Sequence, residues 1–123
     1  VMMPQFRFVY DGIASMLAIL TMMARREQSL GAILAAYPKY SILKGEVPLE
    51  SHRIPQMMDD IESRYPEARK NNMDGLRADF DGCWFHIRVS QTAPLVRVIA
   101  ERRGDPPQTL FEELMDTVRS YNS

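Results

Sequence analysis

The chain has 123 residues and a net charge of −1, with 46% hydrophobic and 25% charged residues. This length suits one compact domain, or one small domain with part of another, and the composition is that of a folded globular chain rather than a disordered one. The near-neutral charge argues against a strongly basic protein that binds nucleic acid or a membrane surface.

The single cysteine, Cys83, excludes an intrachain disulfide framework and favours a reducing cytoplasm. The longest apolar stretch, residues 13–24, is too short to cross a bilayer as a helix, and no signal-peptide flanks frame it. The chain begins with Val1 rather than Met. We therefore expect that a segment was removed or that the chain is a piece of a longer protein.

Two helices are predicted before residue 40. Apolar residues recur at helical spacing from Ile13 to Ala24, and Asp11 is placed to accept the first free backbone N–H groups. A second, short helix is predicted to follow Ser29. It ends before Pro38, because proline lacks the N–H group and disfavours helix in the residue before it.

An extended segment and a third helix come next. Residues 40–50 read as extended, and apolar residues at helical spacing then predict a helix from Ile54 to Tyr65. Pro55 suits the first turn of that helix and Pro66 ends it. Asn71-Asn72 and Asp74-Gly75 are typical of turns.

Alternation of apolar and polar residues predicts three strands, at 76–80, 83–89 and 95–101. Asp81-Gly82 predicts a tight hairpin between the first two. A last helix is predicted over 110–121, with Thr109 and Glu112 as a capping box. The middle strand divides into one face with Cys83, Phe85, Ile87 and Val89 and another with Trp84, His86 and Arg88.

This order of elements predicts the α+β class. Two helices precede a strand, a helix, three strands and a final helix. We expect a mostly antiparallel four-stranded sheet with helices packed on one face.

The segment that says most about chemistry runs from Arg88 to Arg97. Two guanidinium groups flank a short loop that contains the hydroxyls of Ser90 and Thr92, the amide of Gln91 and several free backbone N–H groups. A phosphate needs such forked donors, hydroxyls and N–H groups that point one way. Because the two arginines lie near the ends of adjacent strands, both can face the loop. The alternative interpretation is a hairpin turn with two surface arginines.

The residues from Asp74-Gly75 through Arg88-Val-Ser90-Gln-Thr92-Ala-Pro94-Leu-Val-Arg97 resemble the C-terminal domain of the α-D-phosphohexomutases, the phosphomannomutase/phosphoglucomutase family. That family carries an Arg-Pro-Ser-Asn/Gly-Thr-x-Pro loop followed by another arginine. Residues 11–20 and 37–40 resemble the end of its third domain and the linker into the fourth. The resemblance implies that residues 1–39 are the C-terminal remnant of a preceding α/β domain with its linker, and that residues 40–123 are the C-terminal phosphate-binding domain.

The resemblance also implies a role for the loop. In the family it grips the phosphate of a hexose phosphate while the 1-phosphate and 6-phosphate are interconverted by intramolecular phosphotransfer through a bisphosphate. Carried over by position, the residues that bind the substrate phosphate are Arg88, Ser90, Gln91 and Thr92, with Arg97 as the supporting second charge.

This sequence departs from the family pattern at Val89, Gln91 and Ala93, where proline, asparagine or glycine, and an acidic residue are usual. These departures bear on substrate preference and loop order more than on phosphate binding. The sugar stays open among glucose, mannose, glucosamine and N-acetylglucosamine phosphates, because the sugar-selecting Gly-Glu-x-Ser motif belongs to an earlier domain.

The family's phosphoserine loop and Asp-rich magnesium loop do not occur in these residues, and Asp79-Phe80-Asp81-Gly82 reads as a hairpin. Phosphoryl transfer needs a nucleophile and a metal ion. We therefore expect no cofactor in this stretch, magnesium in the full-length enzyme, and no mutase activity from the chain alone. The partners implied are the phosphosugar and the missing upstream domains.

A different interpretation makes the chain a small single-stranded RNA-binding α+β module, with Trp84, His86 and Arg88 on one strand face. The negative net charge and the lack of a Gly-aromatic strand motif argue against it, so we expect neither a nucleic-acid nor a membrane partner. His52 and His86 have no companions at metal-ligand spacing, which argues against a zinc site.

The apolar stripe of the first helix, residues 13–24, would normally cover a sheet. It must then pack on the rest of the chain or on another copy. We expect the isolated chain to self-associate.

Overall fold

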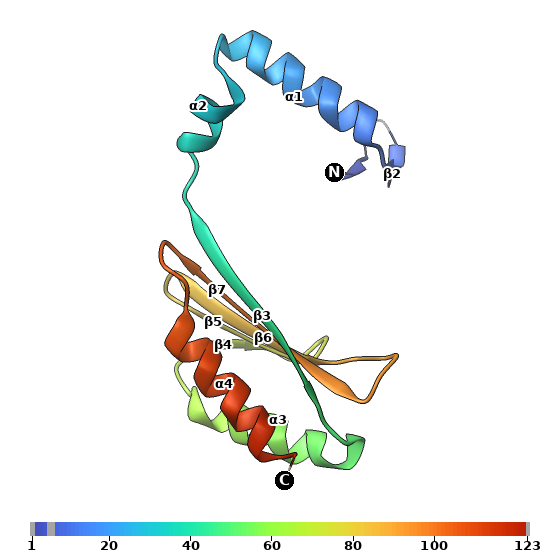
Figure 1. Cartoon of the computed structure of the whole chain (residues 1–123), viewed down its shortest axis with the longest axis vertical. Coiled ribbons are helices and arrows are strands. Elements are labelled where there is room, and N and C mark those ends of the chain that lie inside the picture. Colours follow the sequence, from blue (N-terminus) through green and yellow to red (C-terminus); the bar gives the residue numbers. More distant parts are fainter. Residues whose placement is uncertain (1, 5–6, 123) are drawn as a thin grey trace. The chain divides into compact units, whose positions relative to one another are not determined.

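The structure, a computed structural model, describes residues 2–4 and 7–122. The chain divides into two compact units, Val1–Pro38 and Lys39–Ser123, which are described separately below (Figure 1). We call them unit 1 and unit 2. The division falls one residue before the boundary expected between residues 39 and 40.

Unit 1 holds two short strands and two helices. Strands β1 (Met2–Met3) and β2 (Arg7–Tyr10) pair antiparallel, in a segment for which the sequence made no prediction. Helix α1 spans Gly12–Arg26 and helix α2 spans Leu30–Ala35, which confirms the two predicted helices.

Side chains cap the beginning of both helices, as their sequences indicate. The carboxylate of Asp11 accepts a hydrogen bond from the Ala14 N–H at 2.9 Å, and the hydroxyl of Ser29 accepts one from the Ala32 N–H at 3.2 Å. These bonds satisfy N–H groups that have no partner within the helix. Ile33 is buried, whereas α1 has no buried residue.

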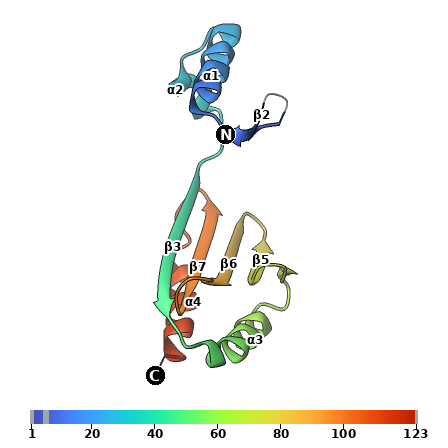
Figure 2. The same ribbon diagram turned by 90° about the vertical axis from the view of Figure 1, so that its right-hand side faces the viewer.

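Unit 2 is built on a five-stranded sheet in the order β3-β7-β6-β5-β4, in which every neighbouring pair is antiparallel (Figure 2). The strands are β3 (Tyr40–Pro48), β4 (Arg69–Asn71), β5 (Leu76–Phe80), β6 (Cys83–Val89) and β7 (Leu95–Arg103). Strand Leu95–Arg103 runs two residues beyond its predicted end. The predicted α+β class with an antiparallel sheet is confirmed.

The prediction of four strands is wrong by one, because it omitted β4. This strand has three polar residues and no apolar alternation that could reveal it. It forms because it pairs with β5, and because the ammonium of Lys70 donates to the carbonyl of Glu62 at 2.7 Å, near the end of helix α3 (Ile54–Arg64). Both partners lie outside the strand's own residues, so the local pattern of residues 69–71 does not reveal it.

The helices of unit 2 cover one face of the sheet, as expected (Figure 1, Figure 2). They are the short 3-10 turn η1 (Ser51–Arg53), α3 (Ile54–Arg64) and α4 (Gln108–Ser120). Gly45 lets α4 approach β3 closely, since a Cβ there would lie 2.7 Å from the sulfur of Met115. The fully buried members of the core between sheet and helices include Met57, Ile61, Phe85, Ile87, Val96, Val98, Ala100 and Val118.

The capping box predicted at Thr109 and Glu112 is wrong. Helix α4 begins two residues earlier than that motif requires, because the Phe111 N–H donates to the carbonyl of Pro107 at 2.9 Å. Thr109 therefore lies inside the first turn, and no side chain caps this end of the helix. Glu112 instead accepts a hydrogen bond from the side chain of Gln108 at 2.6 Å.

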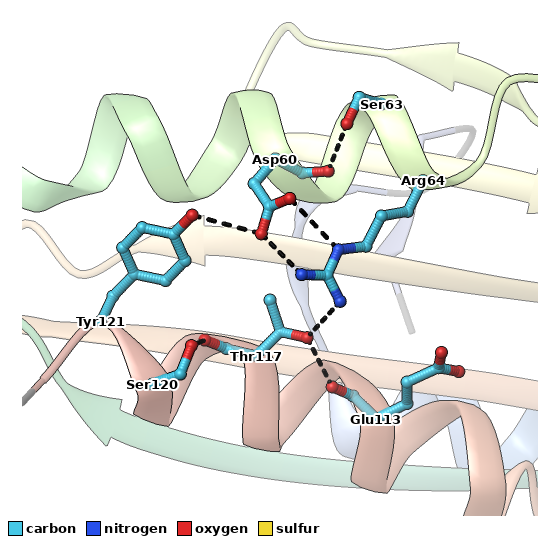
Figure 3. A network of polar contacts seen from close by, with 7 residues as sticks. All are labelled: Asp60, Ser63, Arg64, Glu113, Thr117, Ser120 and Tyr121. Carbon is cyan, nitrogen blue, oxygen red and sulfur yellow. Dashed lines mark hydrogen bonds and ion pairs between the residues drawn. The ribbon is translucent and has the colours of Figure 1, made fainter.

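A polar cluster joins α3 to α4 at their exposed edge (Figure 3). The guanidinium of Arg64 donates to both carboxylate oxygens of Asp60, at 3.2 and 2.8 Å, and to the hydroxyl of Thr117 at 3.1 Å. The phenol of Tyr121 donates to the same carboxylate at 3.2 Å. The hydrogen bond from Arg64 is the main reason why the pKa of Asp60 is lowered.

Candidate functional site

The two arginines of the predicted phosphate site lie directly opposite each other on neighbouring strands. Arg88 of β6 is the register partner of Arg97 of β7. Residues opposite each other in an antiparallel pair project from the same face of the sheet. The face is the one away from the helices, because Phe85 and Ile87, which alternate with Arg88, are buried in the core. The arginine side chains are 36% and 43% exposed, respectively.

Each arginine also contacts a carboxylate on its outer side. Arg97 donates through Nε to Glu46, its register partner on β3, at 2.9 Å, and Arg88 lies with NH1 3.3 Å from an oxygen of Asp74. The order Glu46, Arg97, Arg88, Asp74 forms what we call the charge row. Like charges directly opposite each other destabilise a sheet, so the outer carboxylates make the central pair of cations tolerable.

The loop of residues 90–94 connects the strands that carry the arginines. Its ends are tied down, because the Ser90 N–H donates to the carbonyl of Leu95 at 2.9 Å and the carbonyl of Pro94 accepts from the Leu49 N–H at 3.1 Å. Residues 91–94 are exposed. Among the described residues, the N–H groups of Gln91 and Ala93 have no hydrogen-bond partner. They are therefore available to an acceptor from outside.

The hydroxyls of the loop lie close together. The oxygens of Ser90 and Thr92 are 3.4 Å apart, and the Thr92 N–H lies 3.4 Å from the Ser90 hydroxyl. The structure thus brings all five predicted residues into one hairpin: Arg88 and Arg97 on its strands, and Ser90, Gln91 and Thr92 in its loop. This arrangement offers guanidinium, hydroxyl and amide donors together, which is the chemistry of an oxyanion site.

The donors that remain for a ligand can be named. Arg97 contacts Glu46 through Nε, which leaves its terminal nitrogens without a partner among the described residues. Arg88 uses NH1 toward Asp74, while its Nε is buried without a partner. A shallow depression next to Arg97 is lined by Lys44, Glu46 and Ile99 as well.

Trp84, the aromatic residue of the predicted RNA-binding face, already contacts Arg77 and Glu101. The guanidinium carbon of Arg77 lies 4.1 Å from the centre of the Trp84 ring, and the indole N–H donates to Glu101 at 3.0 Å. A nucleobase could stack on that face of the ring only by displacing Arg77, which is itself held by Asp79 at 2.7 Å. This geometry favours an anion site over the single-stranded RNA platform.

The described residues contain neither a metal-binding cluster nor a helix that could span a membrane. Within residues 2–4 and 7–122, no cluster of three or more His, Cys, Asp or Glu side chains is arranged to hold a metal ion. His52 lies 3.3 Å from the carboxylate of the exposed Glu50. No helix in the same described part of the chain is long and apolar enough to span a membrane.

Sequence reasoning missed the two carboxylates and the glycine that shape the site. Glu46 lies on a strand that was predicted only as an extended segment, and register alone brings it to Arg97. Asp74 and Gly75 were predicted as a turn, but nothing local places that turn against β6. The dipeptide Asp-Gly directly before a strand was the one signal available.

Comparison with known proteins points to one family. A scan against protein-family models found no match. The chain is 28% identical over 119 residues to a probable phosphoglucosamine mutase of Methanopyrus kandleri, covering 94% of this chain and 26% of that protein. It is 33% identical over 99 residues to a phosphoglucosamine mutase of Methanococcus aeolicus, covering 77% of this chain and 22% of that protein. The chain thus spans about a quarter of the length of these relatives.

The fold agrees with these sequence relationships. A crystal structure of a phosphoglucomutase/phosphomannomutase family protein from Burkholderia thailandensis matches with a TM-score of 0.62 and 22% identity, over 90% of this chain and 23% of that one. The match therefore extends over the larger part of both units. The chain is therefore homologous to the phosphohexomutases, over a stretch about the size of their C-terminal domain.

Proposed function

We propose that this chain supplies the substrate-phosphate-binding part of a phosphohexomutase. The observation that carries the proposal is the register pairing of Arg88 with Arg97 beside an exposed loop. In that loop the N–H groups of Gln91 and Ala93 have no acceptor among the described residues, and the hydroxyl oxygens of Ser90 and Thr92 lie 3.4 Å apart. Two guanidinium groups so placed can donate to different oxygens of one dianion. Charge-assisted bonds of this kind are the strongest hydrogen bonds available to a protein surface.

The proposed ligand is a hexosamine phosphate. The relatives named above are phosphoglucosamine mutases, which makes glucosamine phosphate the first substrate to test. In this proposal the donors of the loop and the two arginines of the charge row contact the phosphate and not the sugar. The same donors can then bind a 1-phosphate or a 6-phosphate, as interconversion through a bisphosphate requires.

We further propose that the chain alone does not catalyse the reaction. The nucleophile and the magnesium ion would come from upstream domains, and the complete enzyme would work in the cytoplasm. A coupled assay with the purified 123-residue chain and glucosamine 6-phosphate should show no turnover above buffer. Turnover by the chain would overturn this part of the proposal.

Binding is tested by nuclear magnetic resonance titration of the chain with glucosamine 6-phosphate and with inorganic phosphate. We expect shifts in the amides of residues 88–97. The variant Arg88→Ala should weaken binding by roughly 10- to 100-fold, because a hydrogen bond to a charged group contributes about 1.5–3 kcal/mol. The control Arg69→Ala removes an exposed arginine from the far edge strand and should leave affinity unchanged.

Two outcomes would overturn the proposal: shifts confined to residues outside the loop, or equal affinities for Arg88→Ala and the unchanged chain. A parallel titration with a single-stranded RNA decamer distinguishes the alternative function. RNA binding that shifts Trp84 and His86 without any response to phosphate would favour the RNA-binding module instead.

A further inference from the structure

We infer that the turn at Asp74 and Gly75 is a positioning element, which holds the guanidinium of Arg88 ready for the phosphate before the ligand arrives. The inference deepens the proposed function and rests on it. Neither residue donates to the ligand; both act through Arg88. The turn lies between β4 and β5, so it reaches the site from a strand pair that carries none of the donors.

Gly75 is where the turn meets the neighbouring strand. Its φ angle is +84°, in the left-handed region that residues with a side chain rarely adopt. A Cβ at this position would lie 2.2 Å from the carbonyl oxygen of Ile87 and 2.9 Å from the Cα of Arg88. Only glycine therefore lets the backbone of the turn lie against β6 directly beside Arg88.

This close approach creates two polar contacts with successive outward-facing residues of β6. The carboxylate of Asp74 lies 3.3 Å from NH1 of Arg88, and the carbonyl of Asp74 lies 2.6 Å from Nε2 of His86. The side chain of Asn71 stabilises the turn from inside by accepting from the Met73 N–H at 2.9 Å. One turn thus contacts the strand through both its backbone and its carboxylate.

The contact leaves Arg88 suited to bind an anion. Its Nε is buried, so the stem of the side chain is enclosed, while the side chain as a whole remains 36% exposed. Asp74 contacts one terminal nitrogen and leaves the other for a ligand. A long side chain that is already ordered loses less conformational freedom on binding, which raises affinity. The carboxylate of Asp74 is 65% exposed, so water and salt screen its repulsion of the phosphate.

The chain offers a matched pair of variants to test this. Gly75→Ala and Gly104→Ala both place a side chain at a positive φ, +84° and +88°, but a Cβ at Gly104 meets nothing within 4 Å. Both variants therefore carry similar backbone strain, and only Gly75→Ala pushes the turn off β6. We expect Gly75→Ala to weaken binding of inorganic phosphate and glucosamine 6-phosphate by tenfold or more. Gly104→Ala should bind as the unchanged chain does.

A spectroscopic readout separates positioning from a general loss of structure. The 15N relaxation of the Arg88 Nε–H group should report an ordered side chain in the unchanged chain and in Gly104→Ala, and a mobile one in Gly75→Ala. If Gly75→Ala does not fold, Asp74→Ala makes the same test, with weaker binding and a mobile Arg88 expected. Asp74→Asn should restore part of the phosphate binding and part of the order of Arg88, because its side-chain oxygen can still accept from NH1.

The outcomes separate a failure of the positioning role from a failure of the proposed phosphate binding. If the unchanged chain binds neither inorganic phosphate nor glucosamine 6-phosphate, the proposed function fails. The relaxation of the Arg88 side chain then still shows whether the turn orders that side chain. If phosphate binds and Arg88→Ala abolishes binding, while Gly75→Ala and Asp74→Ala bind normally, the function stands and the positioning role is overturned. Tighter binding by Asp74→Ala would also overturn it, since Asp74 would then compete with the ligand.

Discussion

The two units of the chain use their apolar residues in opposite ways. In unit 1 the apolar stripe of α1 faces solvent: Ile13, Met16, Leu17 and Leu20 are each at least half exposed. In unit 2 the apolar residues of the strands and of α3 and α4 meet in a continuous core, where Phe85 and Met57 have no exposed surface. The same helical spacing of apolar residues therefore predicts a helix in both units, but it coincides with burial in α3 and α4 and not in α1.

The helix ends show the same contrast. Helix α1 has a capping side chain and no buried residue, whereas α4 has no capping side chain and four buried residues. Isolated helices of this length are marginal in water, so α1 depends on its local interactions. Helix α4 is held by packing. Local chemistry supports one unit, and tertiary contacts support the other.

The largest expected effect comes from truncating the core of unit 2. Phe85→Ala should lower the free energy of unfolding by about 3–5 kcal/mol, because it deletes a fully buried ring. Leu34→Ala, at a side chain of α2 that is 61% exposed, should change it by less than about 0.5 kcal/mol. Urea unfolding followed by far-ultraviolet circular dichroism, which reports the helices of both units, measures both. Equal losses for the two variants would contradict the comparison.

The exposed stripe of α1 is proposed to drive self-association. Because burying a leucine contributes about 1.5–3 kcal/mol, the double variant Leu17→Glu/Leu20→Glu should lower the association constant by roughly 100-fold. Sedimentation velocity over a range of concentrations measures the change. Met73→Glu alters a side chain of unit 2 that is 93% exposed and serves as the control. A monomeric unchanged chain at high concentration would refute the proposal.

The cap of α1 provides a smaller effect. Asp11→Ala removes the acceptor of the Ala14 N–H and should destabilise α1 by about 0.5–2 kcal/mol. Amide hydrogen exchange should show the loss in residues 12–26 and leave the sheet of unit 2 unchanged. Thr109→Ala is the matched change in α4, where the side chain caps nothing. Loss of protection in α4 on that change would show that packing does not hold its first turn.

The smallest effect is the pH dependence of the contact between α3 and α4. The hydrogen bond from Arg64, together with that from Tyr121, lowers the pKa of Asp60 below its ordinary value of 3.8. The contact thus stabilises unit 2 fully above the pKa that Asp60 has in the unfolded chain. This stabilisation is lost as the pH falls through the lower pKa of the folded state. Asp60→Asn should flatten the acid limb of a stability-against-pH curve.

The exchange Asp116→Asn controls for the removal of one carboxylate, because Asp116 contacts only Arg119 on its own helix. The pKa of Asp79 is also lowered, chiefly by its hydrogen bonds with Arg77, and this group contributes to the same acid limb. If Asp60→Asn and Asp116→Asn give curves of the same shape, the contact in Figure 3 does not set the acid stability.

Much of the fold could be predicted because local patterns agree with the final structure. Alternation in residues 76–80 and 83–89, with Asp81-Gly82 between them, specifies a hairpin and its buried face without any distant contact. The edge strand β4 escaped prediction for the opposite reason. Its residues Arg69, Lys70 and Asn71 are extended only because β5 and the end of α3 supply partners.

The candidate site divides in the same way. Arg88, Ser90, Gln91, Thr92 and Arg97 are contiguous enough in sequence to indicate a phosphate site, since one hairpin carries them all. Their carboxylate neighbours come from outside the hairpin. Glu46 is 51 residues from Arg97 in sequence, and only the pairing of β3 with β7 joins them.

By itself, the sequence determined the four α-helices, the longer strands of unit 2 with their apolar faces, and the hairpin that carries the two arginines. Tertiary structure decided what surrounds those arginines. It placed Glu46 by strand register and Asp74 by the close approach of Gly75 to β6. The reason is physical: backbone periodicity acts over a few residues, whereas the position of a charge across a sheet depends on which strands pair and in which register.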